Sequence, residues 1–239
     1  GLNGSLEIGS AIYLHMKKSI LFIFTACFLF TTSCSDFLDE EHKTKYSSEY
    51  VFGTPEGLKL AVNALYALQR YYANDTENAT IFALERGTDL AVTNGGTGNF
   101  YGIYDPNYLK PSASQVGFMW RTMYQIIGKA NEIIAAAEDL EDTPSLRATV
   151  SEAKCFRAQS YFLLYRTFDR IWLNIQPTTA ENVNDPRDFH AASEKEVFDL
   201  IYEDLEYAIT NLDWVSDEAG RFTQAAARHM KAKAALWLK

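Results

Sequence analysis

One glycine-rich stretch of the sequence, residues 94–108, gathers aromatic and amide side chains. Asn99, Phe100, Tyr101 and Tyr104 all lie in it. Aromatic rings have apolar faces that can stack on sugar rings, and amides can hydrogen-bond to sugar hydroxyls. We therefore expect these four residues to contact a glycan. The alternative is a loop that packs on its own aromatic rings.

Acidic residues near this stretch raise the question of hydrolysis. Glu85, Asp89 and Asp105 lie in or near it. A glycosidase holds two carboxyl groups roughly 5 to 10 Å apart across a cleft. The sequence fixes no such distance, and most acidic residues of this chain are expected to cap helices or lie on their solvated faces. We therefore do not expect an enzyme.

Histidine and cysteine form no recognisable catalytic or metal-binding pattern. The four histidines, which show neither HExxH spacing nor a Ser/His/Asp order, are His15, His42, His190 and His229. The three cysteines are far apart and form no CxxC pair, which argues against a structural zinc site or a disulfide framework. Cys155 lies in an apolar helical pattern, so we expect a buried small hydrophobe there. We expect no metal and no cofactor.

Composition and charge favour a folded protein without a nucleic-acid partner. The chain has 239 residues, of which 47% are hydrophobic and 22% charged, enough for one large domain or two small ones. It carries 31 acidic residues against 22 Lys and Arg, a formal net charge of −9. Because phosphate neutralisation needs clustered cations, we expect no binding to nucleic acid.

The first 33 residues predict an export signal rather than part of the folded domain. Met16 is followed by Lys17, Lys18 and an apolar run over residues 20–30, which are the n-region and h-region of a signal peptide. The run is shorter than the roughly 20 residues that a membrane-spanning helix needs. We expect residues 1–15 to be upstream read-through and residues 16–33 to be the signal peptide.

The residues after the apolar run resemble a bacterial lipoprotein processing site. Thr32 and Ser33 are small and precede Cys34, although Thr31 stands where leucine is commonest. We expect Cys34 to carry the lipid that anchors the protein to the membrane. The alternative is an ordinary secretory signal in which Cys34 is incidental. Residues 34–53 are polar and irregular, and we expect them to form a tether.

Helical patterns dominate residues 54–239. Capping residues and helical spacing predict helices over about 54–72, 115–139, 143–168, 193–211 and 224–239. Thr143 and Pro144 mark the start of the third helix, and Ser193 with Glu196 forms a capping box for the fourth. The distal half of 143–168 is apolar on nearly all sides, so we expect it at the centre of a bundle. The last pattern runs to the chain end, so we expect an incomplete structural unit.

Two groups of side chains on these helices are expected to be structural. The first group lies on apolar helical faces and is expected to pack in the core: Trp120, Tyr124, Phe162 and Trp237. The second group consists of arginines, which we expect to pair with acids of neighbouring helices rather than face a ligand: Arg157, Arg166 and Arg170.

Five segments together resemble the SusD/RagB family of outer-membrane nutrient-binding lipoproteins of Bacteroidetes. They are residues 34–39 after the signal and residues 120–134, 152–168, 193–212 and 220–238 in the helical part. The resemblance covers essentially the whole mature chain. Family members are longer, so the resemblance implies an N-terminal portion of such a protein.

The resemblance implies a mostly α fold, a tetratricopeptide-like helical repeat array with long irregular loops, truncated here. It also implies a non-enzymatic, lipid-anchored and surface-exposed protein of the outer membrane. Such a protein captures glycans and delivers them to a partner SusC-like TonB-dependent transporter. Three alternatives remain: a peptide-binding RagB-like member, a secreted carbohydrate-active enzyme, and a helical scaffold without a small-molecule site.

Overall fold

The structure is a computed structural model that describes residues 17, 47–74, 110, 114–186 and 189–238. Its helices are α3 (Ser48–Gly53), α4 (Pro55–Asn74), α6 (Ser114–Ala137), α7 (Pro144–Phe168), α8 (Glu194–Asn211) and α9 (Gln224–Trp237). All of them belong to one compact unit, Tyr46–Lys239. The described residues contain no β-strand, which confirms the mostly helical fold predicted from the sequence.

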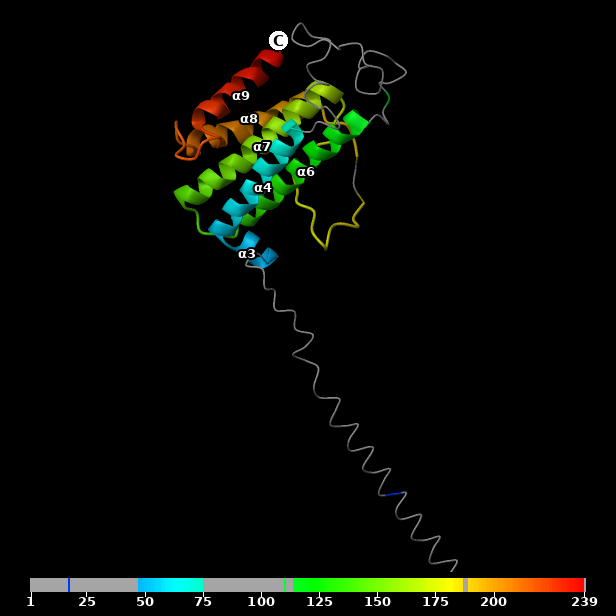
Figure 1. Ribbon diagram of the computed structural model, residues 1–239. Helices are drawn as coiled ribbons and strands as arrows, with labels where there is room; N and C mark the ends of the chain where they lie inside the picture. Colours follow the sequence, from blue (N-terminus) through cyan, green and yellow to red (C-terminus); the bar gives the residue numbers. More distant parts are fainter. Residues whose placement is uncertain (1–16, 18–46, 75–109, 111–113, 187–188, 239) are drawn as a thin grey trace, which may run out of the picture. The chain divides into compact units, whose positions relative to one another are not determined.

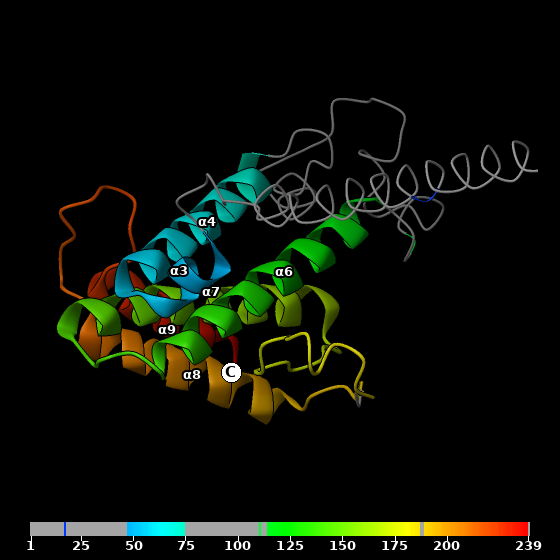
Figure 2. The same cartoon turned by 90° about the horizontal axis from the view of Figure 1, so that it is seen from below.

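Helix α7 lies at the centre of this unit, as its apolar pattern predicts. It contacts α4, α6, α8 and α9, and Figures 1 and 2 show these helices arranged around it. Phe156, Tyr161 and Leu164 of α7 are almost completely buried. Cys155 is buried too, and burial raises the pKa of its thiol. A buried neutral thiol is a poor nucleophile, so Cys155 acts as a small hydrophobe.

The predicted helix starts are confirmed because local capping groups define them. The Thr143 hydroxyl accepts a hydrogen bond from the Leu146 amide, and Pro144 opens α7. Ser193 and Glu196 form the reciprocal hydrogen bonds of a capping box at the start of α8. Each capping group satisfies an amide that the helix itself cannot pair.

A short helix, α3, lies inside the region predicted to be an irregular tether. The Ser47 hydroxyl caps it by accepting from the Tyr50 amide at 3.2 Å. Its backbone packs tightly on α4, where a Cβ atom at Gly57 would lie 2.2 Å from the Tyr50 carbonyl oxygen. A six-residue helix has little intrinsic stability, so this contact with α4 explains a helix that the sequence pattern does not reveal.

The predicted core aromatics lie largely as expected, with one correction. Trp120, Tyr124 and Phe162 are partly buried and pack on the core. Trp237 is 49% exposed: it lies in the last turn of α9, where its ring meets Phe162 edge-to-face with centroids 6.3 Å apart. Within the described part of the chain, no helix is long and apolar enough to cross a membrane.

Candidate functional site: aromatic rings held by buried polar groups

The residues predicted to do chemistry lie outside the described part of the chain. These are the glycan-contact candidates Asn99, Phe100, Tyr101 and Tyr104, together with the lipid-attachment candidate Cys34. Those assignments therefore stay predictions. The acidic residues Glu85, Asp89 and Asp105 also lie outside the described part. The structure does describe the helices on either side of the 94–108 stretch and a second group of aromatic residues.

Helices α4 and α6 flank the predicted glycan-binding stretch. They contact each other and run in opposite directions, so Asn74 and Ser114 lie at the same end of the helical unit. Near that end the ring of Phe118 stacks on buried Tyr72, with centroids 6.2 Å apart, and meets the edge of exposed Tyr71. Residues 75–113, which include the 94–108 stretch, connect these two helices in the sequence. Aromatic side chains therefore lie near both helix ends that this connection joins.

The segment that follows α7 turns sharply and then runs without helical structure. Asp169 has φ 61° and ψ −55°, and the Arg170 amide donates to the Phe168 carbonyl at 2.6 Å. These values define a classic γ-turn, a rare and strained conformation for a residue with a Cβ atom. The turn sends residues 171–176 back along α6 and α7, whose side chains hold them.

Two tyrosine hydroxyls hold this segment at alternate residues. The Tyr124 hydroxyl accepts from the Trp172 amide at 2.9 Å and donates to the Trp172 carbonyl at 2.8 Å. The Tyr161 hydroxyl makes the same pair of hydrogen bonds with Asn174, both at 2.8 Å. Each hydroxyl satisfies both backbone groups of one residue. The positions of Trp172 and Asn174 are therefore fixed by helices α6 and α7.

A buried polar network also holds residues 171–176. Asn131 donates to the Asn174 carbonyl at 2.7 Å and accepts from the Arg157 guanidinium at 2.8 Å. Arg157 binds both carboxylate oxygens of Asp204 at 2.7 Å, and Lys154 binds one of them at 2.9 Å. Burial alone would lower the pKa of Arg157, but the hydrogen bonds and charge of Asp204 outweigh it, and the pKa is raised. Arg157 thus stays charged, and the network links α8, α7 and α6 to the segment.

The structure resolves the predictions for the three arginines differently. Arg157 pairs with Asp204 of a neighbouring helix, as predicted. Arg166 makes no ion pair with the described residues and instead lies over the Phe162 ring, 5.2 Å from its centroid. Arg170 is exposed and makes no ion pair within the described part of the chain. Pairing with an acid is therefore confirmed for Arg157, whereas Arg166 and Arg170 have no acid partner among the described residues.

A row of aromatic rings extends from α6 to the surface at this segment. The Trp120 and Tyr124 centroids are 4.8 Å apart, and Tyr124 stacks on Trp172 at 6.3 Å. The Phe189 ring lies 4.8 Å from Trp172 and is 71% exposed. We call Trp172 and Phe189 the aromatic surface; Tyr124 holds the Trp172 backbone, and the Phe189 ring packs against Trp172. Aromatic ring faces suit the apolar faces of sugar rings.

Sequence reasoning did not identify the aromatic surface. Both residues lie in the connection between the predicted helices 143–168 and 193–211, for which the sequence predicts no function. The available signal was the same one that marked the 94–108 stretch, aromatic residues in a polar, proline-broken segment. The signal was weak because Tyr124, the partner that fixes Trp172, lies 48 residues away in sequence.

The described residues offer no cluster placed to bind a metal ion. No group of three or more His, Cys, Asp or Glu among them is placed to hold a metal ion. Glu152 is buried and accepts a hydrogen bond from Tyr66, while Arg221 lies 3.4 Å away. Burial raises the pKa of Glu152, and the hydrogen bond and Arg221 act against it. The Tyr66 hydroxyl also accepts from the Phe222 amide at 2.7 Å, so this cluster joins the start of α9 to α4 and α7.

A family comparison decides how this helical unit is classified. The family described as "Starch-binding associating with outer membrane", SusD-like, matches residues 36–236. The chain belongs to the SusD-like family. A SusD-like protein of Bacteroides ovatus is 28% identical over 231 residues, covering 91% of this chain and 39% of the relative. SusD-like protein P38 of Formosa agariphila is also 28% identical and covers 93% of this chain and 44% of the relative.

Solved SusD-like structures share the helical arrangement. A "Laminarin binding SusD-like protein" superposes with a TM-score of 0.64 at 26% identity, covering 76% of this chain and 40% of that protein. A SusD superfamily protein from Bacteroides vulgatus superposes with a TM-score of 0.65 at 17% identity, covering 78% of this chain and 40% of that protein. This SusD-like chain therefore spans about two fifths of the length of the relatives it matches.

Proposed function

We propose that this SusD-like protein is an outer-membrane lipoprotein that captures glycans and delivers them to a SusC-like TonB-dependent transporter. The observation that carries the proposal is the match of residues 36–236 to a starch-binding, outer-membrane-associated family. The likeness to a laminarin-binding SusD-like protein supports the ligand class. A second SusD-like structure, 24% identical with a TM-score of 0.59, is described with a xylogluco-oligosaccharide.

Capture in this proposal is non-covalent and uses rings that are already in place. Stacking a sugar on Trp172 and Phe189 removes apolar surface from water, and Trp172 needs no ordering because Tyr124 holds it by two hydrogen bonds. Such preorganisation reduces the entropy lost on binding. Asn99 and Tyr101 of the 94–108 stretch are proposed as further contacts, together with Phe100 and Tyr104.

Calorimetry with a panel of polysaccharides and peptides tests the ligand class, with reducing ends measured in the same samples. We expect saturable binding to one glycan class and no new reducing ends. Alanine at Phe189 or Tyr101 should weaken that binding by about 2- to 10-fold, the effect of one ring contact. Trp214, 60% exposed in another connection, supplies the control, and Trp214→Ala should bind as the parent does. New reducing ends would identify an enzyme, and peptide binding alone would identify a peptide-binding member.

The membrane anchor has its own test. We propose that the Cys34 thiol carries the lipid, so Cys34→Ser should move the protein from the membrane fraction to the soluble fraction of cells. Cys27→Ser is the matched control, because Cys27 lies in the apolar run that precedes the processing site. Membrane retention of Cys34→Ser in cells that lack the partner transporter would contradict lipid anchoring.

A further inference from the structure

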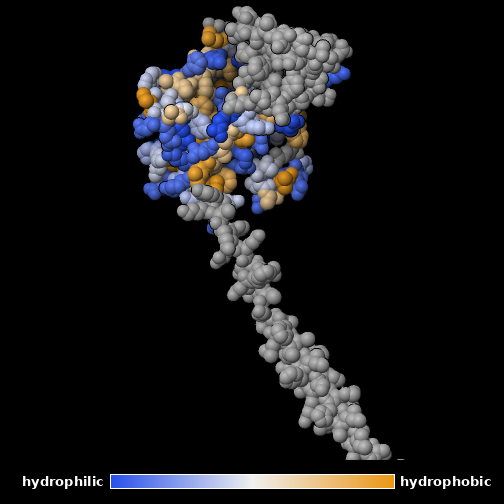
Figure 3. Space-filling model, viewed as in Figure 1, coloured by the Kyte–Doolittle hydropathy of each residue, from blue (hydrophilic) through white to orange (hydrophobic). Residues whose placement is uncertain are grey.

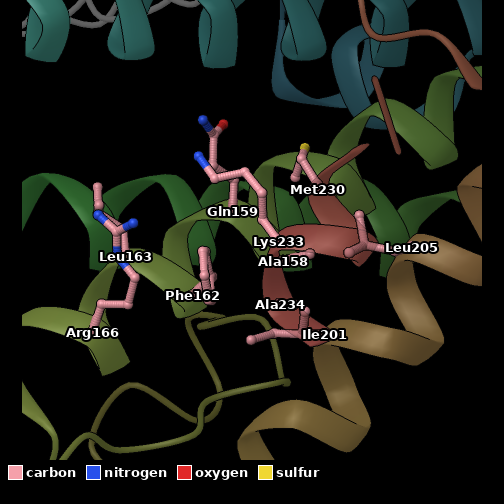
Figure 4. Close-up of a pocket in the computed structure, with 10 residues that line it drawn as sticks. All are labelled: Ala158, Gln159, Phe162, Leu163, Arg166, Ile201, Leu205, Met230, Lys233 and Ala234. Atoms are coloured by element: carbon pink, nitrogen blue, oxygen red, sulfur yellow. The ribbon is translucent and has the colours of Figure 1, made fainter. Parts of the chain in front are cut away.

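A pocket of about 120 Å³ lies between α7, α8 and α9, and neither Trp172 nor Phe189 lines it. Phe162 and Ala158 of α7, Ile201 and Leu205 of α8, and Met230 and Ala234 of α9 line its apolar interior (Figure 4). Leu236 and Leu238 are exposed near the end of α9, where Figure 3 shows apolar residues. A pocket of this kind favours a compact apolar group.

Two cations at the pocket lack carboxylate partners within the described part of the chain. Arg166 and Lys233 both line it, and no acidic residue does. Arg166 contacts ring faces instead, 5.2 Å from the Phe162 centroid and 5.9 Å from that of Trp237. By contrast, Lys231, which lies in α9 as Lys233 does, pairs with Glu206. In a chain with a net charge of −9, two neighbouring cations without acids mark a place for an anionic ligand group.

An amide oxygen at the same pocket lacks a hydrogen-bond donor. The Oε1 atom of Gln159 is buried and has no hydrogen-bond partner among the described residues, although Gln159 lines the pocket. Figure 4 shows its amide and the end of Lys233 pointing to the same side of the pocket. A buried acceptor without a donor is costly, so a ligand that supplies an N–H group there recovers this cost.

These three features together specify one ligand chemistry. We infer that the pocket binds the C-terminal residue of a peptide that ends in an apolar side chain. That side chain occupies the apolar interior, the terminal carboxylate lies between Arg166 and Lys233, and the N–H of the terminal residue donates to Gln159 Oε1. A sugar lacks the apolar side chain, and a simple fatty acid lacks the N–H. The site shares no lining residue with the aromatic surface.

Binding of N-acetyl-L-phenylalanine, compared with N-acetyl-L-phenylalaninamide, tests this inference. The two probes share the side chain and the N–H and differ in the terminal carboxylate. Ligand-observed NMR titration of the full chain should show saturable binding of the acid and about tenfold or weaker binding of the amide, the effect of losing charge-assisted hydrogen bonds. Equal affinity for both probes, or no saturable binding of the acid, would overturn the inference.

Variants of the pocket assign the contacts. Arg166→Gln and Lys233→Gln should each weaken binding of the acid by about tenfold while leaving binding of the amide nearly unchanged. Gln159→Leu should weaken binding of both probes, because both supply the N–H group that donates to Gln159. Arg170 of the α7 end and Arg228 of α9 are exposed and do not line the pocket, so Arg170→Gln and Arg228→Gln serve as charge-matched controls. If these controls weaken binding of the acid as much as Arg166→Gln does, the effect comes from net charge and the inference fails.

Discussion

Replacing Asp204 with asparagine is expected to destabilise the fold by about 3–5 kcal/mol, the usual cost of breaking a buried ion pair from one side. The Asp204 side chain is fully buried, and those of Arg157 and Lys154 are only 6% and 12% exposed. The asparagine keeps the shape but leaves two cations beside a neutral amide. They cannot reach water without disturbing the packing of α7 against α8.

The same structure predicts how the loss can be recovered. Replacing Arg157 with methionine and Asp204 with leucine together removes both charges of the pair, so the double variant should be destabilised by less than the sum of the single variants. Asn131 also loses its Arg157 partner in any such variant. The Trp172 and Asn174 amides, held by the tyrosine hydroxyls on that segment, should then exchange with deuterium faster than in the parent.

Urea denaturation at low temperature, followed by circular dichroism, measures the effect. A domain of this size has a total stability of about 5–15 kcal/mol, so the Asp204→Asn variant should still fold in the cold with a clearly lower midpoint. Asp199 of the same helix forms an exposed pair with Lys195, with side chains 62% and 82% exposed. Asp199→Asn should therefore change stability by no more than about 0.5 kcal/mol. If the two variants unfold at the same urea concentration, the buried network does not stabilise the fold as argued.

Three further predictions concern local geometry. Asp169→Gly should stabilise the protein by about 1 kcal/mol, because glycine adopts φ 61° without the penalty of a Cβ atom; a lower melting temperature would contradict the strained turn. Hydrogen bonds from Ser193 hold the pKa of Glu196 below the ordinary 4.5, so its contribution to stability is present above pH 4.5 and is lost as pH falls through the lowered pKa. NMR titration should show that pKa, and Ser193→Ala should return it toward 4.5. Tyr124→Phe should cost about 1–3 kcal/mol in chemical denaturation by leaving both backbone groups of Trp172 unpaired, and unchanged stability would show that the hydroxyl does not hold them.

The sequence predicted best those features that depend on neighbouring residues. The starts of α7 and α8 follow from Thr143 with Pro144 and from Ser193 with Glu196, because a capping side chain bonds an amide three residues away. Helix α3 was missed because its stability comes from packing on α4. Trp237 was placed in the core because helical spacing shows which face is apolar but not whether another element covers it.

The site was harder to predict because its partners are distant in sequence. Asp204 and Arg157 are 47 residues apart, and Tyr124 and Trp172 are 48 apart. No local pattern reveals such pairs. The predicted contacts Asn99, Phe100, Tyr101 and Tyr104 lie outside the described residues, so their role stays a prediction. The family assignment, by contrast, came from short segments along the whole chain and is confirmed.

The most direct test of glycan capture is calorimetric titration of the chain without its first 34 residues against individual polysaccharides, with reducing ends measured before and after. The proposed function predicts saturable binding of one glycan class, unchanged reducing ends, and weaker binding by Phe189→Ala but not by Trp214→Ala. Absence of binding to every glycan, or release of new reducing ends, would contradict it.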